Sequence, residues 1–449
     1  MARFWLTLWL LTGLTGLAIA EDFDALFDDD AFADVEVRTQ PAESHWHWQN
    51  RLDWQAIYNT RRDGESDAER AYSGWSANRF YWQPRLSWQP ATGVGWTGEA
   101  RLGWDSIFTL RDNAPWHPDD RDAREWTAEL REFRFWLPLG PGSLSYGVQT
   151  ETLGLLDGLS VLNVLNAQDR TVPGLASPDD AALPNRSAIY STALADYRVR
   201  TGMVQLFYPD RLPPVGSDFN PGGQSPRLVK PGEADLGAYL AMSRASGPWD
   251  WQFLIASSFD SSGYLTVNEG ELERRFSRVN RAGAAVSRVQ GIAIWKAEMA
   301  LVHNLEAAAL MPGPQGPVPH GAHRYHQWQS ALGAEWNLGQ ANLVAEVRHN
   351  QTFQQDGELE LAGVTESSQQ WLLAMRSRHW RERLELNARV FGQGFDADSG
   401  VIAGVGIAYD WRDGMTSELN WLTYREGNLP PLQQASGNDR LVLSSRWTW

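Results

Sequence analysis

The chain has 449 residues, a formal net charge of −16 at pH 7, no cysteine and 24 tryptophans. The acidic balance argues against a nucleic-acid partner, because contact with a phosphate backbone needs a basic face. The lack of cysteine excludes disulfides, thiolate metal sites and thiol catalysis, and the excess of tryptophan is typical of proteins at a membrane–water interface.

The first segment, residues 1–20, has the pattern of a secretory signal peptide. One charge, Arg3, precedes an apolar run that ends at Leu17, and the sequence "AIA" then supplies the small-x-small cleavage pattern. An uncleaved membrane anchor is the alternative, but the run is short and no basic residue follows it. We therefore expect an exported chain that is cut before Glu21.

Residues 21–44 form an acidic segment that we expect to lie in the periplasm. Its first part, 21–36, carries eight acids and no base. Phe23, Leu26 and Phe27 fit one side of a short amphipathic helix, which would dock a periplasmic partner or plug the inlet of a barrel. A disordered acidic tail is an equally compatible alternative.

From His45 onward, apolar and polar residues alternate. In "HWHWQNRLDWQAIY", three tryptophans and Leu52 share one face, and charged or amide side chains share the other. Alternation with this period predicts strands, about 16–18 of them. The segments begin near His45, Arg79, Gly95, Trp126, Ser143, Ala188, Arg200, Leu236, Trp249, Arg281, Ile292, Tyr325, Ala341, Gln370, Arg383, Ile402, Met415 and Arg440. The phase slips near Arg131, which indicates a bulge.

The connections between these segments alternate in length. Short turns such as "PLGPG" and "NLGQ" follow every second segment, and long loops such as 59–78, 111–125, 209–233 and 303–324 follow the others. This alternation is typical of outer-membrane barrels. The fold prediction is therefore all-β: a transmembrane antiparallel β-barrel over 45–449, with short periplasmic turns and long outer loops. A secreted β-sandwich or propeller is the alternative.

The chain ends on "DRLVLSSRWTW". Its odd positions, including Trp447 and Trp449, form one apolar face of a strand that reaches the last residue. This ending resembles the C-terminal signature by which the barrel assembly machinery recognises outer-membrane barrels. We therefore expect insertion into the lipid of the outer membrane of a Gram-negative bacterium.

In a membrane barrel the apolar stripe faces lipid and the charged stripe lines the lumen. Strand parity assigns these side chains to the lumen: Arg51, Asp53, Arg85, Glu99, Arg101, Glu129, Arg131, Glu298, Glu335, Glu346, Arg348, Glu385, Arg389 and Glu418. Because sixteen or more strands leave room inside a barrel, we favour a channel with a charged lumen. A plugged barrel, whose interior charges pair only with one another, is the alternative.

The loop 151–187 is unusually apolar for an outer loop. A segment of this kind would not stay in water, so we expect it to fold into the lumen and narrow it, as the third loop of porins does. The predicted constriction residues are Leu153, Leu155, Leu156, Asp157, Leu159, Val161, Leu162, Asn166 and Asp169. Packing of the loop against its neighbours at the rim is the alternative.

Two stretches, "GLLDGLSVLNVLNAQD" and "LFYPDRLPPVGSDF", carry a resemblance over roughly 145–220. They resemble a family of outer-membrane barrels catalogued as a domain of unknown function, through Asp157, Gly158, Leu159, Asn166, Asp169, Arg211, Leu212, Pro213, Pro214, Gly216, Ser217 and Asp218. The family's Trp-Gly pair is absent, and Ala167 replaces a proline. The resemblance implies a neighbouring RND-type exporter and a periplasmic partner, hence export or envelope lipid traffic.

Other chemistries have weaker support. His320, His323 and His326 lie close together in a proline-rich stretch, but their spacing favours a solvated loop over a metal site. A hydrolase would need a nucleophile beside His349, and none is evident. We therefore expect no enzyme, metal or cofactor, and a channel or export conduit for small or amphiphilic molecules. A closed structural sheath and an outer-membrane hydrolase are the alternatives.

Overall fold

The computed structural model describes residues 45–60, 66–90, 93–175, 178–222, 225–232, 235–313, 316–353, 356–395, 399–427, 432, 435 and 437–449. The expectations for 1–20 and 21–44, including Phe23, Leu26 and Phe27, lie outside these residues. No helix in the described ranges is long and apolar enough to cross a membrane.

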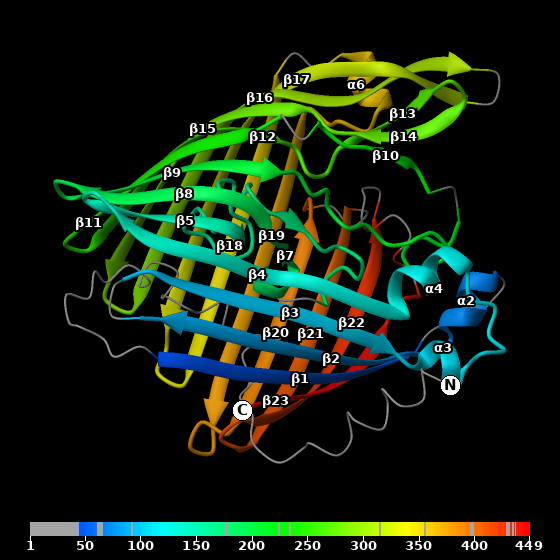
Figure 1. Cartoon of the computed structure of the whole chain (residues 1–449). Helices are drawn as coiled ribbons and strands as arrows, with labels where there is room; N and C mark the ends of the chain where they lie inside the picture. The colour runs from blue at the N-terminus through cyan, green and yellow to red at the C-terminus, as the bar shows by residue number, and fades with distance from the viewer. Residues whose placement is uncertain are drawn as a thin grey trace.

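Eighteen antiparallel strands form one closed barrel (Figure 1), which confirms the predicted fold. The strands are β1 (His45–Asn59), β2 (Gly74–Gln89), β3 (Gly95–Asp105), β4 (Trp126–Leu139), β5 (Gly142–Gln149), β8 (Asn185–Leu194), β9 (Tyr197–Leu206), β11 (Gly237–Ser246), β12 (Trp249–Phe259), β15 (Arg278–Gln290), β16 (Ala293–Gly313), β17 (Gly316–Asn337), β18 (Ala341–Phe353), β19 (Ser367–His379), β20 (Leu384–Gln393), β21 (Ser399–Arg412), β22 (Met415–Gly427) and β23 (Arg440–Thr448). Each pairs with the next along this series, and β23 pairs with β1.

The last residue completes the closing ladder. The amide of Trp449 donates to the carbonyl of Asn50 at 3.0 Å, and the amide of Asn50 donates to the carbonyl of Trp449 at 2.8 Å. Closure satisfies the backbone groups that an open sheet would expose to lipid. Recognition of Trp447 and Trp449 by assembly machinery stays a prediction.

Short elements gather at the long-loop end of the barrel (Figure 1). They are α2 (Asp67–Tyr72), α3 (Ile107–Leu110), α4 (Pro118–Arg124), α6 (Gly357–Leu361) and a small sheet of β10 (Arg227–Val229), β13 (Tyr264–Asn268) and β14 (Glu271–Arg275). The helix α5 (Pro178–Ala181) and the pair β6 (Ala167–Gln168) and β7 (Ala182–Leu183) lie within the barrel instead, where Asp180 pairs with Arg51 of β1 at 3.3 Å. At the opposite end, the described connections between barrel strands are short turns, as the loop-length alternation predicts.

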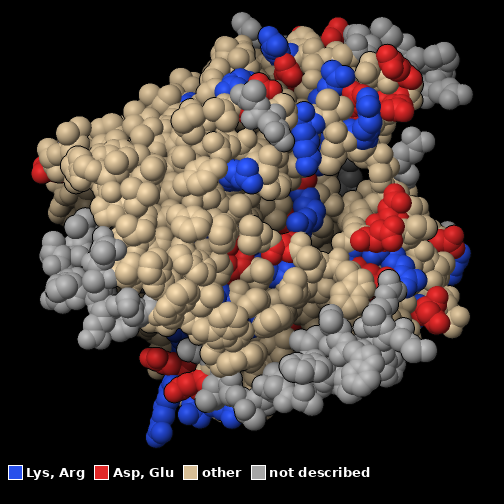
Figure 2. Space-filling view, in the orientation of Figure 1, with Lys and Arg blue, Asp and Glu red and all other residues tan. Residues whose placement is uncertain are grey.

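The outer face of the wall is apolar between two aromatic rows. Trp46 and Trp88 lie 6.0 Å apart near the short turns, and Trp104 and Trp126 stack at 5.8 Å near the long loops. Figure 2 shows uncharged surface over most of the wall, with charges gathered mainly toward its edges. An apolar band flanked by aromatic girdles is the surface that a barrel presents to lipid.

Two local expectations have different outcomes. The bulge near Arg131 is confirmed, because β3 residues Glu99 and Ala100 pair with Glu132 and Leu130 and leave Arg131 between them. The prediction of a long loop over 303–324 is wrong.

Instead, β16 and β17 continue as a long hairpin to Gly313 and from Gly316. Register shifts after Val302 and Ala309 absorb its irregularities, and Asn304 adopts a φ of 69° there. The strand β13 and the helix α6 lie against the hairpin. These tertiary contacts favour pairing in a glycine- and proline-rich stretch that local sequence assigns to a loop.

Candidate functional site

The segment 153–165 lies inside the barrel, against the wall formed by β11 to β18. Two wall carboxylates, Glu298 of β16 and Glu346 of β18, accept hydrogen bonds from its backbone amides. Glu298 accepts from the amides of Leu155, Leu156, Val161 and Leu162 at 2.5–3.3 Å and from the hydroxyl of Ser160 at 2.8 Å. Glu346 accepts from the amides of Asp157, Gly158 and Leu159 at 2.7–3.1 Å.

Both carboxylates are nearly covered, with Glu298 at 3% and Glu346 at 4% exposure. A buried carboxylate is costly unless donors surround it. Here the loop's own amides supply those donors, and the carboxylates in turn satisfy amides that would otherwise be buried without acceptors. The segment and the two carboxylates therefore stabilise each other inside the lumen.

The apolar side chains of the same segment pack against the barrel wall. Leu153, Leu156, Val161, Leu162 and Leu165 are at most 8% exposed and share one cluster with inward side chains of the wall. The wall residues of this cluster are Tyr239, Ala241, Leu254, Ala256, Val279, Ala285, Ala300, Val302, Leu305 and Ala331. Five of these ten wall residues are alanines, and their small side chains leave space for the segment inside the barrel.

Further polar contacts, in the middle of the segment and at its flanks, complete its attachment. Asp157 forms an ion pair with Lys296 at 2.9 Å, and Lys296 also lies 3.4 Å from Glu335. The amide side chain of Asn166 exchanges two hydrogen bonds with the backbone of Glu151. Arg348 contacts the carbonyl of Ser160 at 3.4 Å.

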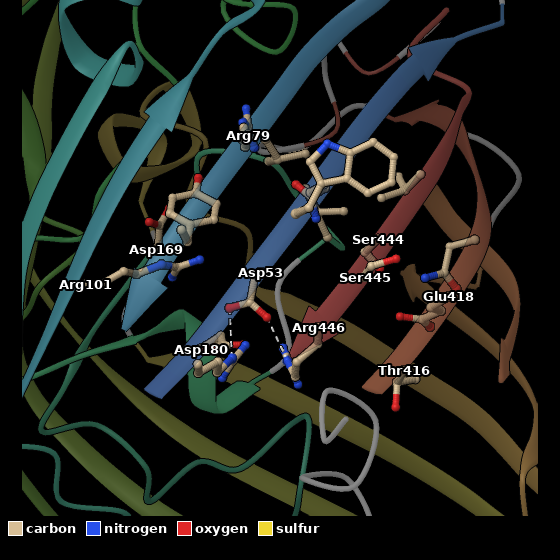
Figure 3. Close-up of a pocket in the computed structure, with 18 of the residues that line it drawn as sticks. Asp53, Arg79, Arg101, Asp169, Asp180, Thr416, Glu418, Ser444, Ser445 and Arg446 are labelled. Atoms are coloured by element: carbon tan, nitrogen blue, oxygen red, sulfur yellow. Dashed lines mark hydrogen bonds and ion pairs between the residues drawn. The ribbon is translucent and has the colours of Figure 1, made fainter. Parts of the chain in front are cut away.

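A cavity of about 470 Å³ remains on the opposite side of the lumen. Its lining comes mainly from β1 to β4 and β19 to β23, and it includes seven of the predicted lumen charges: Arg51, Asp53, Arg101, Glu129, Glu385, Arg389 and Glu418. Figure 3 shows several of them pointing toward one another across the space. Of the remaining predicted charges, Arg85, Glu99 and Arg131 lie on inward positions of β2 to β4 beside this cavity.

Most arginines of the cavity are paired with carboxylates. Asp53 accepts from Arg446 at 2.7 Å and from Arg51 at 2.8 Å, and Glu385 accepts from Arg376 at 2.8 Å. Arg101 differs, because its guanidinium lies 4.0 Å above the ring of Tyr81 and its buried Nε has no hydrogen-bond partner.

The long-loop end of the cavity is covered by an apolar cluster. Phe219, Ile402, Leu422, Tyr424, Leu432, Ala435 and Val442 are buried there, with Val172 and Leu175 packed against them. Tyr424 donates its hydroxyl proton to the carbonyl of Pro173 at 2.8 Å, and Arg389 donates to the carbonyl of Gly174. A buried ion pair between Asp218 and Arg440, at 2.8 Å, fixes the same cover.

The two stretches that carry the family resemblance meet at this site. Arg211 forms ion pairs with Glu129 at 2.5 Å and Asp169 at 2.9 Å. Burial lowers the pKa of Arg211, but the two carboxylates raise it, and the net shift is upward. The guanidinium therefore stays charged. Pro213 and Pro214 lie in the turn that follows, where their carbonyls accept from Asn220 and Ser217.

The two described histidines of the proline-rich stretch have different partners. His323 contacts Asp356 at 3.1 Å and Glu358 at 3.3 Å, whereas His326 stacks on His303 at 4.0 Å. The side chain of His320 is outside the described part. No group of three or more metal-ligating side chains occurs among the residues that the structure describes.

His349 of β18 contacts an amide side chain on the adjacent strand β19. Ser330 and Gln369 lie directly across from it on the adjacent strands, and His349 contacts Gln369 at 3.3 Å. Within the described ranges no hydrogen bond joins Ser330 to His349, which a serine nucleophile and its base require.

Sequence reasoning assigned Glu298 and Glu346 to the lumen but missed their role as acceptors for the loop. Their partners are backbone amides more than 130 residues away, and such donors leave no trace in a sequence. It also missed the buried pair of Asp218 and Arg440, although a lone arginine at the apolar start of a strand was a usable signal.

Comparison with solved structures shows that the fold is that of outer-membrane porins. OccAB4 of Acinetobacter baumannii matches with a TM-score of 0.52 and 9% identity, over 92% of this chain and 99% of that one. OccK8 (OprE) of Pseudomonas aeruginosa matches with a TM-score of 0.51 and 9% identity, over 90% and 98%. An 18-stranded barrel with this apolar outer band is a protein of the Gram-negative outer membrane.

No protein-family model matches the chain, and no curated protein matches its sequence. The architecture expected from the resemblance over 145–220 is supported. Its family assignment and its link to RND-type exporters have no support here.

Proposed function

We propose that the protein is an outer-membrane channel that conducts small molecules, anions in preference to cations, through the cavity beside the infolded segment. The observation that carries this proposal is the divided lumen. One half is filled by the segment 153–165, and the other retains a charged cavity of about 470 Å³. A wide barrel narrowed by an inward segment discriminates solutes by size and charge.

The charge of the cavity supports the preference for anions. Although the whole chain is acidic, the described lining of the cavity holds nine arginines and seven carboxylates. A small anion beside Arg101 would fill the place of the hydrogen-bond partner that its buried Nε lacks.

Reversal potentials in planar bilayers test this proposal. With a tenfold KCl gradient across the membrane, we expect stable single-channel currents and a reversal potential of the sign that chloride selectivity gives. A cation-selective current would contradict the charge argument. A folded barrel without any current would contradict the channel itself and favour the closed sheath.

Export with a periplasmic partner is a finer proposal that rests on the family resemblance. In it, Phe23, Leu26 and Phe27 dock the partner or plug the inlet. Deletion of 21–44 separates the two roles in purified protein. A plug predicts a higher conductance after the deletion, whereas a docking segment predicts an unchanged conductance.

A further inference from the structure

The barrel wall has a notch on its long-loop side, next to β4. The strands β5, β8, β9 and β11 have 8 to 10 residues, whereas β4 has 14. β4 pairs with β5 only from Phe133 to Leu139, so no described strand pairs with 126–132 on that edge. Figure 2 shows a hollow and charged side chains on this side of the barrel.

The notch lies at the level of the outer lipid leaflet. Trp126 stacks on Trp104, which stacks on Phe80 at 6.2 Å, and these rings form the outer aromatic row on this side. Residues 127–132 follow Trp126 toward the short-turn end of the barrel. Because an aromatic girdle marks the membrane interface, the edge of β4 lies just inside the membrane.

Ion pairs cross the notch where strand pairing is missing. Arg211 on one side reaches Glu129 on β4, and its backbone is held from within by Gln168 and Arg170. The guanidinium side chain is 43% exposed. Exposed ion pairs are weak because water screens their charges, so this closure is far weaker than the backbone ladder that closes the rest of the wall.

The charged cavity extends to this notch. Trp126 and Ala128 point outward from β4, yet both line the cavity together with Glu129, Asp169 and Arg211. Toward the long loops the cavity is covered by the apolar cluster around Tyr424. The cavity therefore reaches the barrel wall at the notch, where the Arg211–Glu129 ion pair lies across it.

We propose that the notch is a lateral opening for an anionic amphiphile, whose head group binds in the arginine-lined cavity while its apolar tail extends into the outer leaflet. Arg211 meets the head group at the opening. Leu130 and Leu212, 49% and 45% exposed, flank the tail. The inference rests on the proposed channel function and names a substrate class for it.

Thiol accessibility tests the opening directly, because the chain has no cysteine of its own. Leu130→Cys places a thiol at the notch. Leu102→Cys is the matched control, since β3 is paired on both edges and Leu102 lies opposite Ala128 at a similar depth. In proteoliposomes, a charged membrane-impermeant methanethiosulfonate should modify the first thiol at least tenfold faster than the second. Equal modification rates of the two thiols, with both variants folded, would overturn the proposed lateral opening.

Protection by ligand tests the substrate class with the same readout. Decyl sulfate should slow modification of Leu130→Cys at least fivefold, whereas methyl sulfate at the same concentration should not. If neither decyl sulfate nor methyl sulfate slows the modification, or if both slow it equally, the proposal of an amphiphilic substrate is overturned. These rates do not depend on conductance. If Leu130→Cys reacts but the barrel carries no current, the channel proposal fails and the lateral opening stands. If the barrel conducts but Leu130→Cys does not react, the lateral opening fails and the channel proposal stands.

Discussion

The inner wall of the barrel has two unlike halves. From β11 to β17 the inward positions are mostly small or aliphatic, as at Ala241, Ala285 and Ala300, and the apolar segment packs on them. From β19 round to β4 the inward positions hold arginines and carboxylates, and a cavity remains. The pattern of the wall therefore decides which half the segment fills, because an apolar segment gains nothing against a charged surface.

The largest change should come from removing the two acceptors that hold the segment. In the double variant Glu298→Ala, Glu346→Ala, seven amides of the segment lose their acceptors. Hydrogen bonds to charged groups contribute roughly 1.5–3 kcal/mol each. We expect the segment to leave the wall and single-channel conductance to rise at least threefold. Glu335→Ala removes an inward carboxylate that holds no loop amide, and should leave conductance within about 20%.

The buried pair of Asp218 and Arg440 closes the charged half at its long-loop end. Breaking a buried ion pair costs about 3–5 kcal/mol, so Asp218→Ala should make the segment 213–220 sensitive to protease in an otherwise folded barrel. The exposed pair of Arg227 and Glu271 provides the control, because Glu271→Gln should leave cleavage unchanged. Equal cleavage of both variants would show that the buried pair has no special part in the cover.

Steric change on the apolar half should have a smaller effect. Ala300 points at the segment and is 1% exposed, so Ala300→Leu overpacks the contact by about 1–3 kcal/mol. In bilayer recordings we expect the current to switch between two conductance levels. Ala297 lies on the lipid-facing side of the same strand, and Ala297→Leu should give the same single conductance level as the unchanged protein.

The smallest expected effect concerns selectivity. Arg101→Gln removes the cation whose Nε lacks a partner, and should lower the chloride-to-potassium permeability ratio about twofold without a change in barrel stability. Arg85 is bound to Glu99 and Glu132 at 3.1 Å, so Arg85→Gln should change the ratio less. If the unchanged protein, Arg101→Gln and Arg85→Gln had the same chloride-to-potassium permeability ratio, Arg101 would have no part in anion selectivity.

Alternation in the sequence was sufficient to predict the barrel, because a lipid-facing strand leaves a two-residue period that survives without tertiary information. The apolar composition of 151–187 likewise predicted that this loop folds into the lumen. Local sequence failed over 303–324, where β13 and α6 favour pairing of a stretch rich in turn residues. It also failed for Glu298 and Glu346, since backbone donors brought from a distant loop have no residue signature.

Single-channel conductance of the purified protein, compared with a variant that lacks residues 153–165, tests the divided lumen most directly. The account predicts a stable current in the unchanged protein and at least a threefold higher conductance after the deletion, with the barrel still folded. Equal conductance in the two proteins would contradict it, because the segment would then not occupy the conducting lumen.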